Sequence, residues 1–506
     1  MALWATSKLA IGSSNAGMLR ESCLVKFPVG VSAPLAILGD IAYFPTWDGR
    51  FVAFDYKSCQ VHWNISVSDI ITGFAPLTTL QVSYTRAASR STPQFDESVL
   101  YFTTLAYALV VAVDRQTGAY LAVTQINSHE LATLTMSPTF YKGKLLVGAS
   151  SQEEAAAGFT PDYACCSFVG NMAAVEYDES AREFKTVWDI SMITAGSTPP
   201  GWSGVAVRGS QPSIDEARSQ VFVATGNVYS VPPEYESCLM KADTNITSTN
   251  STCLPGNILQ EAVLALDIGT GAIIWSHVVS PLDSWTTACE YGASLPNVAV
   301  CPGTPGPDAD FGMAPTFVLP SRWTPNKEDT VVIGQKNGVI HAFSAKDVTL
   351  HWSSATSHDG VEGGLIWGIA VDDKRVYFAA VNSNFVSWQV QPLNHTIDNS
   401  AFGALSLLNG SILWEIPSPY DSISFVQPSV VNDTLFTGRT GQNKTGSHDL
   451  TRGGLIVIDK RSGLMIKDYN LDVNFHGGVA IQNDYVMFGT GYNGFSGVGG
   501  FHVYTL

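Results

Sequence analysis

The sequence is poor in charged residues and poorest in basic ones. Of its 506 residues only 14% are charged, and 27 Lys and Arg stand against 44 Asp and Glu, which gives a net charge of −17. An excess of negative charge disfavours binding to a nucleic-acid backbone or to an anionic membrane surface. No apolar run approaches the roughly 20 residues that a membrane-spanning helix requires. With 45% hydrophobic residues, the chain is expected to be globular and to bind neither nucleic acid nor lipid.

Paired CxxC motifs are also missing, so the eight cysteines do not indicate a zinc site. Their connectivity is formally open. Two of the pairings would close loops of roughly 15 residues or fewer, for which a disulfide is strongly stabilising. These two pairs are Cys238–Cys253 and Cys289–Cys301. The adjacent Cys165 and Cys166 would form a third pair, which leaves Cys23 and Cys59 as the fourth.

Seven Asn-x-Ser/Thr sequons accompany these cysteines, and together they favour an oxidising secretory route with N-glycosylation. The opening stretch 1–17 makes a poor signal peptide, because Lys8 interrupts its apolar run. We therefore expect a leader that is missing or atypical. The sequon asparagines are Asn64, Asn245, Asn250, Asn394, Asn409, Asn432 and Asn443.

One pattern recurs eight times along the chain: an apolar run, a turn, a second run ending in Asp or a similar residue, a polar turn with Gly, and a last run often containing Trp. It occupies 43–63 and 101–123, continues through units ending at 188, 275, 352, 414 and 469, and stops at the C-terminus without its last run. Alternating apolar residues between such turns are typical of antiparallel strands. The pattern predicts an all-β protein, an eight-bladed β-propeller over 22–506, after a leader or extension at 1–21.

The run 23–28 is expected to supply the strand that the last unit lacks and so to close the ring. A stack of β-sandwich domains is the alternative, which the even spacing disfavours. Five tryptophans recur at one position near the repeat end, which predicts a role in packing blade against blade. They are Trp63, Trp188, Trp275, Trp352 and Trp414.

With these repeats the chain resembles the quinoprotein alcohol dehydrogenase superfamily, and within it the polyvinyl-alcohol-dehydrogenase-like branch. The resemblance implies an eight-bladed propeller with pyrroloquinoline quinone (PQQ) and calcium at the axis. It rests on Ser89–Pro93, Thr135–Pro138, Cys165–Phe168, Ala224–Asn227, Pro307–Gly312 and Gln335–Gly338.

Two positions depart from the superfamily pattern. Cys165 stands where the resemblance implies an acidic calcium ligand, and sulfur is a poor substitute for oxygen at calcium. In the stretch Asp283–Thr286, Thr286 stands where it implies the catalytic Asp, and a hydroxyl is not basic near neutral pH. These departures predict that the redox site is lost, so that no cofactor and no metal is expected.

The chain is further similar to fungal hetero-Diels–Alderases of tropolonic sesquiterpene biosynthesis. That resemblance implies an inverse-electron-demand [4+2] addition of a tropolone o-quinone methide to a humulene-type alkene, with small-molecule substrates and no redox cofactor. Two alternatives stay open: a PQQ- and calcium-dependent alcohol dehydrogenase, and a non-catalytic secreted propeller that binds a glycan or a protein.

Three residues are candidates for catalysis of this addition. Lys336 follows an inner strand and is expected to polarise a carbonyl oxygen of the substrate. His476 is expected to act as an acid near working pH, and Asp283 to orient these donors. The alternatives are a solvent-facing lysine in a turn and a structural histidine.

A further set is expected to line the substrate site with aromatic and polar groups. For Asp310 the alternative is a turn cap, and for Arg90 an ion pair between blades. The set consists of Trp47, Arg90, Trp202, Asn227, Trp285, Asp310, Phe311, Trp367 and Phe425.

Overall fold

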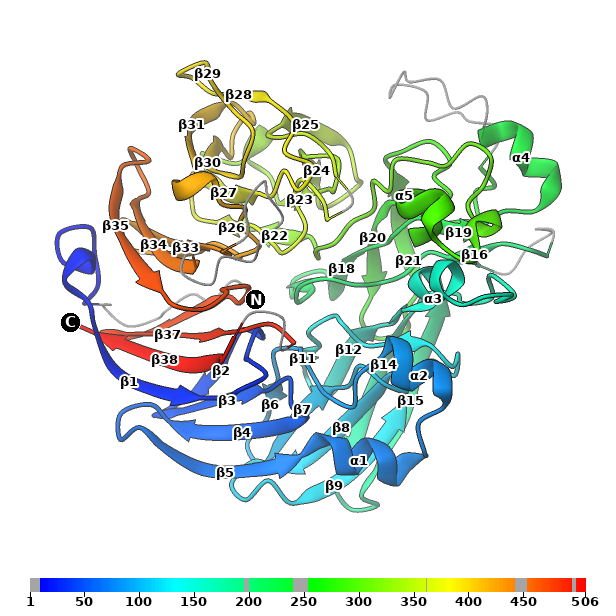
Figure 1. Cartoon of the computed structure of the whole chain (residues 1–506), viewed down its shortest axis with the longest axis horizontal. Helices are drawn as coiled ribbons and strands as arrows, with labels where there is room; N and C mark the ends of the chain where they lie inside the picture. The colour runs from blue at the N-terminus through cyan, green and yellow to red at the C-terminus, as the bar shows by residue number, and fades with distance from the viewer. Residues whose placement is uncertain (1–9, 195–199, 240–253, 361, 442–452, 494–496) are drawn as a thin grey trace.

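The computed structural model describes residues 10–194, 200–239, 254–360, 362–441, 453–493 and 497–506 (Figure 1). Eight four-stranded antiparallel sheets surround a central axis, which confirms the eight-bladed β-propeller. The blades follow chain order, and the strands of each are given from the innermost outward. Blade 1 consists of β2 (Ala36–Leu38), β3 (Ile41–Pro45), β4 (Arg50–Asp55) and β5 (Gln60–Ser66), and blade 2 of β6 (Gln94–Phe95), β7 (Val99–Thr103), β8 (Leu109–Asp114) and β9 (Tyr120–Gln125). Blade 3 consists of β11 (Thr139–Tyr141), β12 (Lys144–Gly148), β14 (Asn171–Asp178) and β15 (Glu183–Ser191), and blade 4 of β17 (Ser213–Asp215), β18 (Gln220–Ala224), β20 (Ala262–Asp267) and β21 (Ile273–Val278).

The next three blades repeat this order. They consist of β22 (Thr316–Val318), β23 (Thr330–Gly334), β24 (Val339–Ser344) and β25 (Leu350–Ala355); β26 (Ala370–Val371), β27 (Arg375–Ala380), β30 (Ala401–Ser406) and β31 (Ile412–Pro417); and β32 (Ser429–Val431), β33 (Thr434–Arg439), β34 (Gly453–Asp459) and β35 (Met465–Leu471). The repeated apolar runs become the buried second and third strands of each blade, because both of their faces pack against neighbouring blades.

Blade 8 joins the two ends of the chain. Its strands β36 (Val479–Gln482), β37 (Tyr485–Thr490) and β38 (Gly500–Thr505) are completed by β1 (Arg20–Lys26), which pairs antiparallel with β38 from Arg20 opposite Thr505 to Lys26 opposite Gly500. This confirms ring closure by an N-terminal strand, which begins three residues before the expected run. Part of the expected extension also packs on the ring, since Ile11 and Ala16 share a core cluster with Val431 of blade 7.

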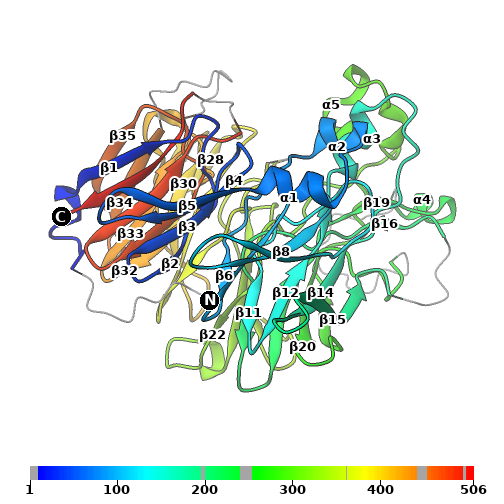
Figure 2. The same ribbon diagram turned by 90° about the horizontal axis from the view of Figure 1, so that it is seen from below.

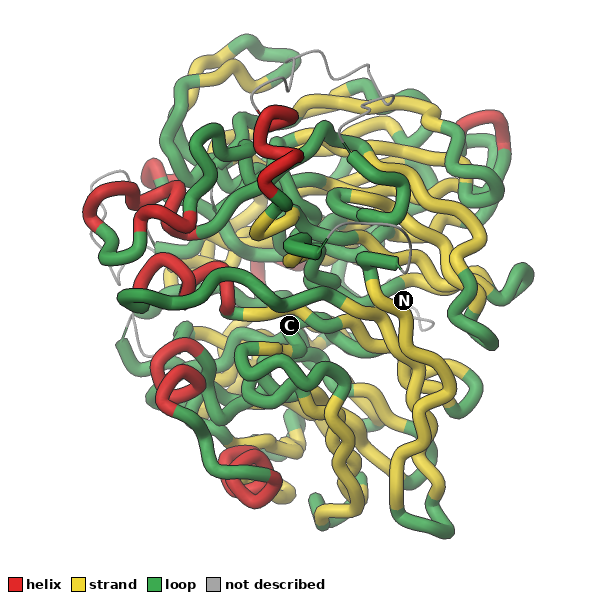
Figure 3. Tube along the Cα trace, turned by 90° about the vertical axis from the view of Figure 1, so that its right-hand side faces the viewer, coloured by secondary structure: helices red, strands yellow, loops and turns green. Residues whose placement is uncertain are grey.

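The helices lie in connections between strands, except for the first 3-10 turn, which precedes β1. They are α1 (Val67–Phe74), α2 (Thr79–Tyr84), α3 (Glu153–Phe159), α4 (Pro233–Leu239), α5 (Thr287–Tyr291) and the short 3-10 turns η1 (Ala16–Met18), η2 (Gly292–Ser294), η3 (Val298–Val300), η4 (Pro325–Lys327) and η5 (Pro419–Asp421). Three ribbons, formed by β10 (Ala132–Thr133) with β13 (Ser150–Ser151), β16 (Ser203–Gly204) with β19 (Val228–Ser230), and β28 (Trp388–Val390) with β29 (His395–Ile397), add to the loops. Figure 2 shows α1, α2, α3 and α5 gathered on one face, and in Figure 3 most of the red helical segments lie toward one side.

That face carries two kinds of connection. In an antiparallel blade, the turn from the second to the third strand and the link from the outermost strand to the next blade emerge on the same side. Links of the second kind pack against one another around the axis: a Cβ at Gly209 would lie 2.5 Å from Met313, and one at Gly312 would lie 2.4 Å from Ile366. Side chains from several blades are therefore brought together on this face.

The recurring tryptophans join successive blades at their outer edges. Each indole Nε1 donates to a backbone carbonyl of the next blade, which gives a partner to a polar group that would otherwise be buried unpaired. The bonds are Trp63 to Arg115 (3.2 Å), Trp188 to Ile268 (2.9 Å), Trp275 to Ala345 (3.1 Å), Trp352 to Leu407 (3.0 Å) and Trp414 to Lys460 (3.2 Å). The predicted packing role of these five residues is confirmed.

Three of the expected disulfides are formed, which is consistent with an oxidising compartment. They are Cys23–Cys59, Cys165–Cys166 and Cys289–Cys301. The Cys238–Cys253 pairing and the sequons at Asn245, Asn250 and Asn443 involve positions outside the described residues. The sequon asparagines Asn64, Asn394, Asn409 and Asn432 are exposed, and their glycosylation stays a prediction. Within the described ranges, no helix combines the length and the apolar character needed to cross a bilayer.

Candidate functional site

Lys336 lies at the centre of a buried charged cluster on the helical face. It occupies the turn between β23 and β24, and its Nζ lies 2.9 Å from Asp308 Oδ2 and 3.1 Å from Asp310 Oδ1. Arg208, in the link before β17, forms an ion pair with Asp310 and lies 3.6 Å from Glu154 of α3. Lys336 is only 5% exposed, so the alternative of a solvent-facing lysine is wrong. Asp310 pairs with cations from two blades, Arg208 and Lys336, so its role is not limited to capping a turn.

The two aspartates provide a carboxylate base where the sequence pattern predicted none. Burial raises the pKa of Asp308 to about 7, although the charge of Lys336 acts in the opposite direction. A carboxyl group that titrates near neutral pH is well suited to accept a proton from a substrate. The loss of the site's carboxylate, which was inferred from Thr286, is therefore corrected. Thr286 is buried, and carboxylates come instead from Asp308 and Asp310, which lie beside Lys336.

Asp283 holds the loop that carries these aspartates. Its Oδ2 accepts a hydrogen bond from the backbone N–H of Ala309 at 2.9 Å. A Cβ at Gly306 would lie only 1.9 Å from Asp283 Oδ1, so the loop and this carboxylate fit closely together. Asn227 acts on the opposite flank, where its Nδ2 donates to the carbonyl oxygens of Val228 (3.0 Å) and Trp285 (3.1 Å). Asp283 and Asn227 thus position backbone rather than forming ion pairs.

Five other predicted residues meet in an aromatic cluster around Tyr492, which the sequence analysis missed. We define the aromatic cluster as Trp47, Arg90, Trp367, Phe425, His476 and Tyr492. The ring of Tyr492 packs at 4.9 Å on Trp47 and at 4.5 Å on His476, which in turn stacks on Phe425 at 5.2 Å.

Arg90 closes this cluster. Its guanidinium donates to Tyr492 Oη at 3.2 Å and lies 5.5 Å from the ring of Trp367, a cation–π distance. Trp367 contacts Phe425 edge-on at 6.3 Å. Arg90 therefore binds aromatic groups of blades 6 and 8 and makes no carboxylate ion pair among the described residues, unlike the alternative of an ion pair between blades.

The two clusters adjoin one another. The backbone N–H of Gly364 donates to the carbonyl oxygen of Lys336 at 2.6 Å, and a Cβ at Gly363 would lie 3.0 Å from Lys336 Cγ. The same segment leads within a few residues to Trp367 of the aromatic cluster. A ligand at this junction would meet charged groups on one side and aromatic rings on the other.

Trp285, Phe311 and Trp202 also lie outside both clusters. Trp285 is buried, and its backbone N–H donates to the carbonyl oxygen of Val228 at 3.1 Å. Phe311 is fully buried in the core between blades 4 and 5, where it packs with residues such as Phe222 and Phe343. Trp202 packs edge-on against Tyr235 of α4 at 4.9 Å. Phe311 therefore packs in the core. Trp202, which directly precedes β16, lies against α4.

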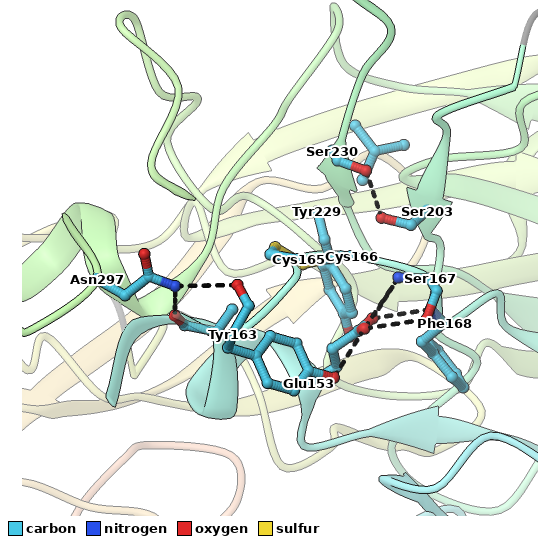
Figure 4. The surroundings of a disulfide bond; sticks show 12 residues. Glu153, Tyr163, Cys165, Cys166, Ser167, Phe168, Ser203, Tyr229, Ser230 and Asn297 are labelled. Atoms are coloured by element: carbon cyan, nitrogen blue, oxygen red, sulfur yellow. Dashed lines mark hydrogen bonds between the residues drawn. A yellow bond between two sulfur atoms is a disulfide. The ribbon is translucent and has the colours of Figure 1, made fainter. Parts of the chain in front are cut away.

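A buried carboxylate also lies beside the vicinal disulfide (Figure 4). Glu153 of α3 accepts hydrogen bonds from the backbone N–H groups of Ser167 (2.9 Å) and Phe168 (2.8 Å), which directly follow Cys165–Cys166. Its Oε1 lies 3.3 Å from His129 Nε2. An acidic group is thus present at this segment, although it comes from another part of the chain than Cys165.

Several buried polar atoms near these clusters have no hydrogen-bond partner within the described part of the chain. They include Thr286 Oγ1, Asp308 Oδ1 and Trp367 Nε1. Buried polar atoms are nearly always paired in folded proteins, so these atoms fit a site that receives a polar ligand.

The same groups do not form a metal site. Over the described ranges, no set of three or more His, Cys, Asp and Glu side chains is arranged to hold a metal ion. Asp308 and Asp310 face the cations of Lys336 and Arg208 instead. The residues present therefore fit an anionic, planar organic ligand better than calcium.

Comparisons with known proteins place this geometry in context. A family model described as outer membrane protein assembly factor BamB matches residues 259–496. The polyvinylalcohol dehydrogenase of Sphingopyxis sp. (strain 113P3) is 26% identical over 73% of this chain and 51% of its own length. The chain thus spans about half the length of that curated relative.

Solved structures resemble the whole ring. A quinohemoprotein alcohol dehydrogenase of Pseudomonas putida HK5 superposes with a TM-score of 0.68 at 14% identity, covering 98% of this chain and 78% of the other. A europium-containing methanol dehydrogenase superposes with a TM-score of 0.64 at 14% identity, covering 98% and 95%. These names contradict the expectation of a site without a cofactor and give no support to a hetero-Diels–Alderase. The chain has the eight-bladed fold of the quinoprotein alcohol dehydrogenases, and its sequence is similar to polyvinylalcohol dehydrogenases.

Proposed function

We propose that the protein is an alcohol dehydrogenase that binds a quinone cofactor of the PQQ type and oxidises a secondary or polymeric alcohol. The observation that carries the proposal is the buried charged cluster of Lys336, Asp308, Asp310 and Arg208 beside an aromatic cluster. The dehydrogenase relatives and the shared fold support it. The partner is then a small or polymeric alcohol.

The cations and rings fit the chemistry of such a cofactor. Lys336 and Arg90 would bind the oxygens of an anionic quinone, because Arg matches carboxylate geometry and a buried Lys supplies a compact charge. Trp367 would offer an aromatic surface to its ring system. The bound quinone would supply the acceptor for the two electrons and the hydrogen that leave the carbinol carbon.

Asp308 is the proposed base. Lys336 holds one of its oxygens, Oδ2, while Oδ1 has no hydrogen-bond partner within the described residues. That free oxygen would accept the hydroxyl proton of the alcohol as its C–H bond breaks and a carbonyl forms. Lys336 would stabilise the ionised carboxylate before the transfer. Since the described carboxylates do not form a metal site, we derive no step through calcium.

The test is dye reduction by the purified protein after incubation with PQQ, with calcium, a lanthanide or neither. The substrates are a secondary alcohol, polyvinyl alcohol and methanol. We expect reduction that depends on PQQ and on a secondary or polymeric alcohol. Binding of PQQ, followed by quenching of tryptophan fluorescence, should need no substrate.

Failure to bind PQQ and to oxidise any of these alcohols would contradict the proposal. In that case the same protein, mixed with a tropolone quinone-methide precursor and humulenol, would show whether it forms the cycloaddition product. Inactivity in both assays would favour the non-catalytic binding propeller.

A further inference from the structure

Glu261 is a fully buried carboxyl group behind the charged cluster. It immediately precedes β20, and its backbone is fixed on both sides, since its N–H donates to Gly226 O and its carbonyl accepts from Val279 N, each at 3.0 Å. Its φ of +42° lies in the left-handed region, which costs energy for a residue with a side chain. The chain thus holds a glutamate in a strained and buried position.

The side chain of Glu261 faces another carboxyl group. It interacts with the side chain of Asp283, and its Oε2 accepts from Gln335 Nε2 at 3.4 Å, while Glu261 Oε1 and Asp283 Oδ1 are both buried without a hydrogen-bond partner among the described residues. The other groups facing it are Ser280 and, at longer range, Asp308. His341, whose pKa burial lowers to about 4, lies behind Gln335 at 3.3 Å and is neutral near pH 7.

Among the residues that the structure describes, no ion pair joins a cation to Glu261 or Asp283, so the pair keeps a proton. Two carboxylates in contact and away from water repel each other strongly, and retaining one proton converts the repulsion into a hydrogen bond. Burial, and after it the charge of Asp283, raise the pKa of Glu261 well above its usual value. Asp283 accepts the N–H of Ala309 through Oδ2, which leaves its Oδ1 to accept a hydrogen bond from Glu261.

We propose that Glu261 is a positioning residue that, as a neutral carboxylic acid, donates a hydrogen bond to Asp283 and so fixes the loop 306–310 against Lys336. The link runs from Glu261 to Asp283, from Asp283 to the N–H of Ala309, and from Ala309 to the aspartates on either side. Glu261 itself touches no substrate. This inference rests on the proposed function only for its effect on turnover.

Two substitutions separate this role from simple packing. Glu261→Gln keeps a neutral donor of the same shape and should retain most of the activity. Glu261→Ala removes the donor and should lower kcat by about 10²-fold, the cost of a small misplacement of a catalytic group. Rescue by Gln but not by Ala is what hydrogen-bond donation requires.

The pH dependence gives a further readout. At alkaline pH Glu261 loses its proton, the two carboxylates repel, and the loop loosens. We therefore expect kcat of the wild type to fall on the alkaline side, and this fall to be absent from Glu261→Gln. The thermal stability of the wild type should decline as the pH rises above about 4.5, the ordinary glutamate pKa, and level off once Glu261 ionises, because the folded state holds this proton more tightly than the unfolded state.

Infrared spectroscopy tests the proton directly, without cofactor or substrate. In protein labelled with ¹³C at the glutamate carboxyls, a carboxylic-acid C=O band from Glu261 should persist well above the pH at which ordinary glutamates ionise and disappear in Glu261→Gln. The matched control is Glu415 of β31, a second buried glutamate whose pKa burial raises to about 7. Glu415→Gln should remove a band that titrates near pH 7 and leave turnover unchanged.

The outcomes distinguish this inference from the proposed function. An unchanged C=O band in Glu261→Gln, or wild-type kcat and pH profile in Glu261→Ala, would overturn the role of Glu261. If no alcohol is oxidised, the infrared band and the pH dependence of stability still decide whether Glu261 holds the proton.

Discussion

The charged cluster and the aromatic cluster adjoin, yet they are stabilised differently. In the charged cluster Asp308 and Lys336 are almost fully buried, and burying such ions costs more than most single contacts return. In the aromatic cluster, His476 stacks between Phe425 and Tyr492, and these contacts stabilise by burying ring surface and by ring stacking, without a buried ion pair. A fold has no need of the first arrangement, which indicates that the charged cluster is kept for chemistry. The aromatic cluster both shapes the site and supports it.

The largest expected effect comes from removing the base of the charged cluster. Asp308→Asn should lower kcat by about 10²–10⁴-fold, the usual contribution of a general base. Because the base must be deprotonated, kcat of the wild type should rise with pH through about 7, where Asp308 titrates. Steady-state dye reduction over a pH series measures both effects.

The control for this substitution is Asp329→Asn, which removes a carboxylate 2.8 Å from Arg218, outside both clusters. It should leave kcat and its pH dependence unchanged. A variant Asp308→Asn that keeps the wild-type rate would show that the charged cluster is structural.

A second, smaller effect concerns stability. Lys336→Met leaves Asp308 and Asp310 without their shared cation, and breaking a buried pair in this way typically costs about 3–5 kcal/mol of unfolding free energy. Urea denaturation measures it. The exposed pair of Lys185 with Asp178 is the control, since Lys185→Met should hardly change stability. Equal effects of the two substitutions would remove the distinction between buried and exposed pairs.

The smallest expected effect lies in the aromatic cluster. Tyr492→Phe removes the hydrogen bond from Arg90 but keeps the stacking on His476, so stability should fall by only about 0.5–1.5 kcal/mol. Quinone affinity should weaken by up to about tenfold while kcat stays near the wild-type value. Fluorescence titration and dye reduction measure these quantities.

Tyr377→Phe provides the comparison for Tyr492→Phe. It removes a buried hydroxyl in β27 of blade 6 that is hydrogen-bonded to Asp372 at 2.9 Å and belongs to neither cluster. It should change stability by a similar amount and leave quinone affinity unaltered. A loss of kcat in Tyr492→Phe as large as that in Asp308→Asn would contradict the division of roles between the two clusters.

Features that repeat in the sequence could be predicted, and features that occur once could not. The tryptophans at blade edges recur at one position, so their packing role follows from the repeat. Arg208 was missed although it carries a signal: like Arg90, it precedes an innermost strand and is followed by a short polar segment ending in Pro. Tyr492 occupies the turn between the second and third strands of blade 8, as Trp47 and Lys336 do in blades 1 and 5, and Glu261 lies in the corresponding connection of blade 4. These positions in the repeat do not reveal the partners of the two residues. Only folding brings them to Asp283 and Arg90.

The base of the proposed reaction illustrates the same limit. Thr286 was compared with a short motif and suggested that the carboxylate was gone, because a motif compares positions along the chain. The structure supplies carboxylates from Asp308 and Asp310, more than twenty residues later, because the loop that carries them folds back beside Asp283. Chemistry at a propeller axis depends on which groups meet in space.

The pairing of Arg20 with Thr505 has a consequence for biosynthesis. While the chain is being translated, β1 has no partner until β38 is made, and seven complete blades lie between the two strands along the chain. The nascent protein therefore carries up to seven assembled blades with unpaired strand edges at both ends, which are prone to associate with other chains. Chaperones that shield such edges during translation would then decide how much of this protein a cell obtains.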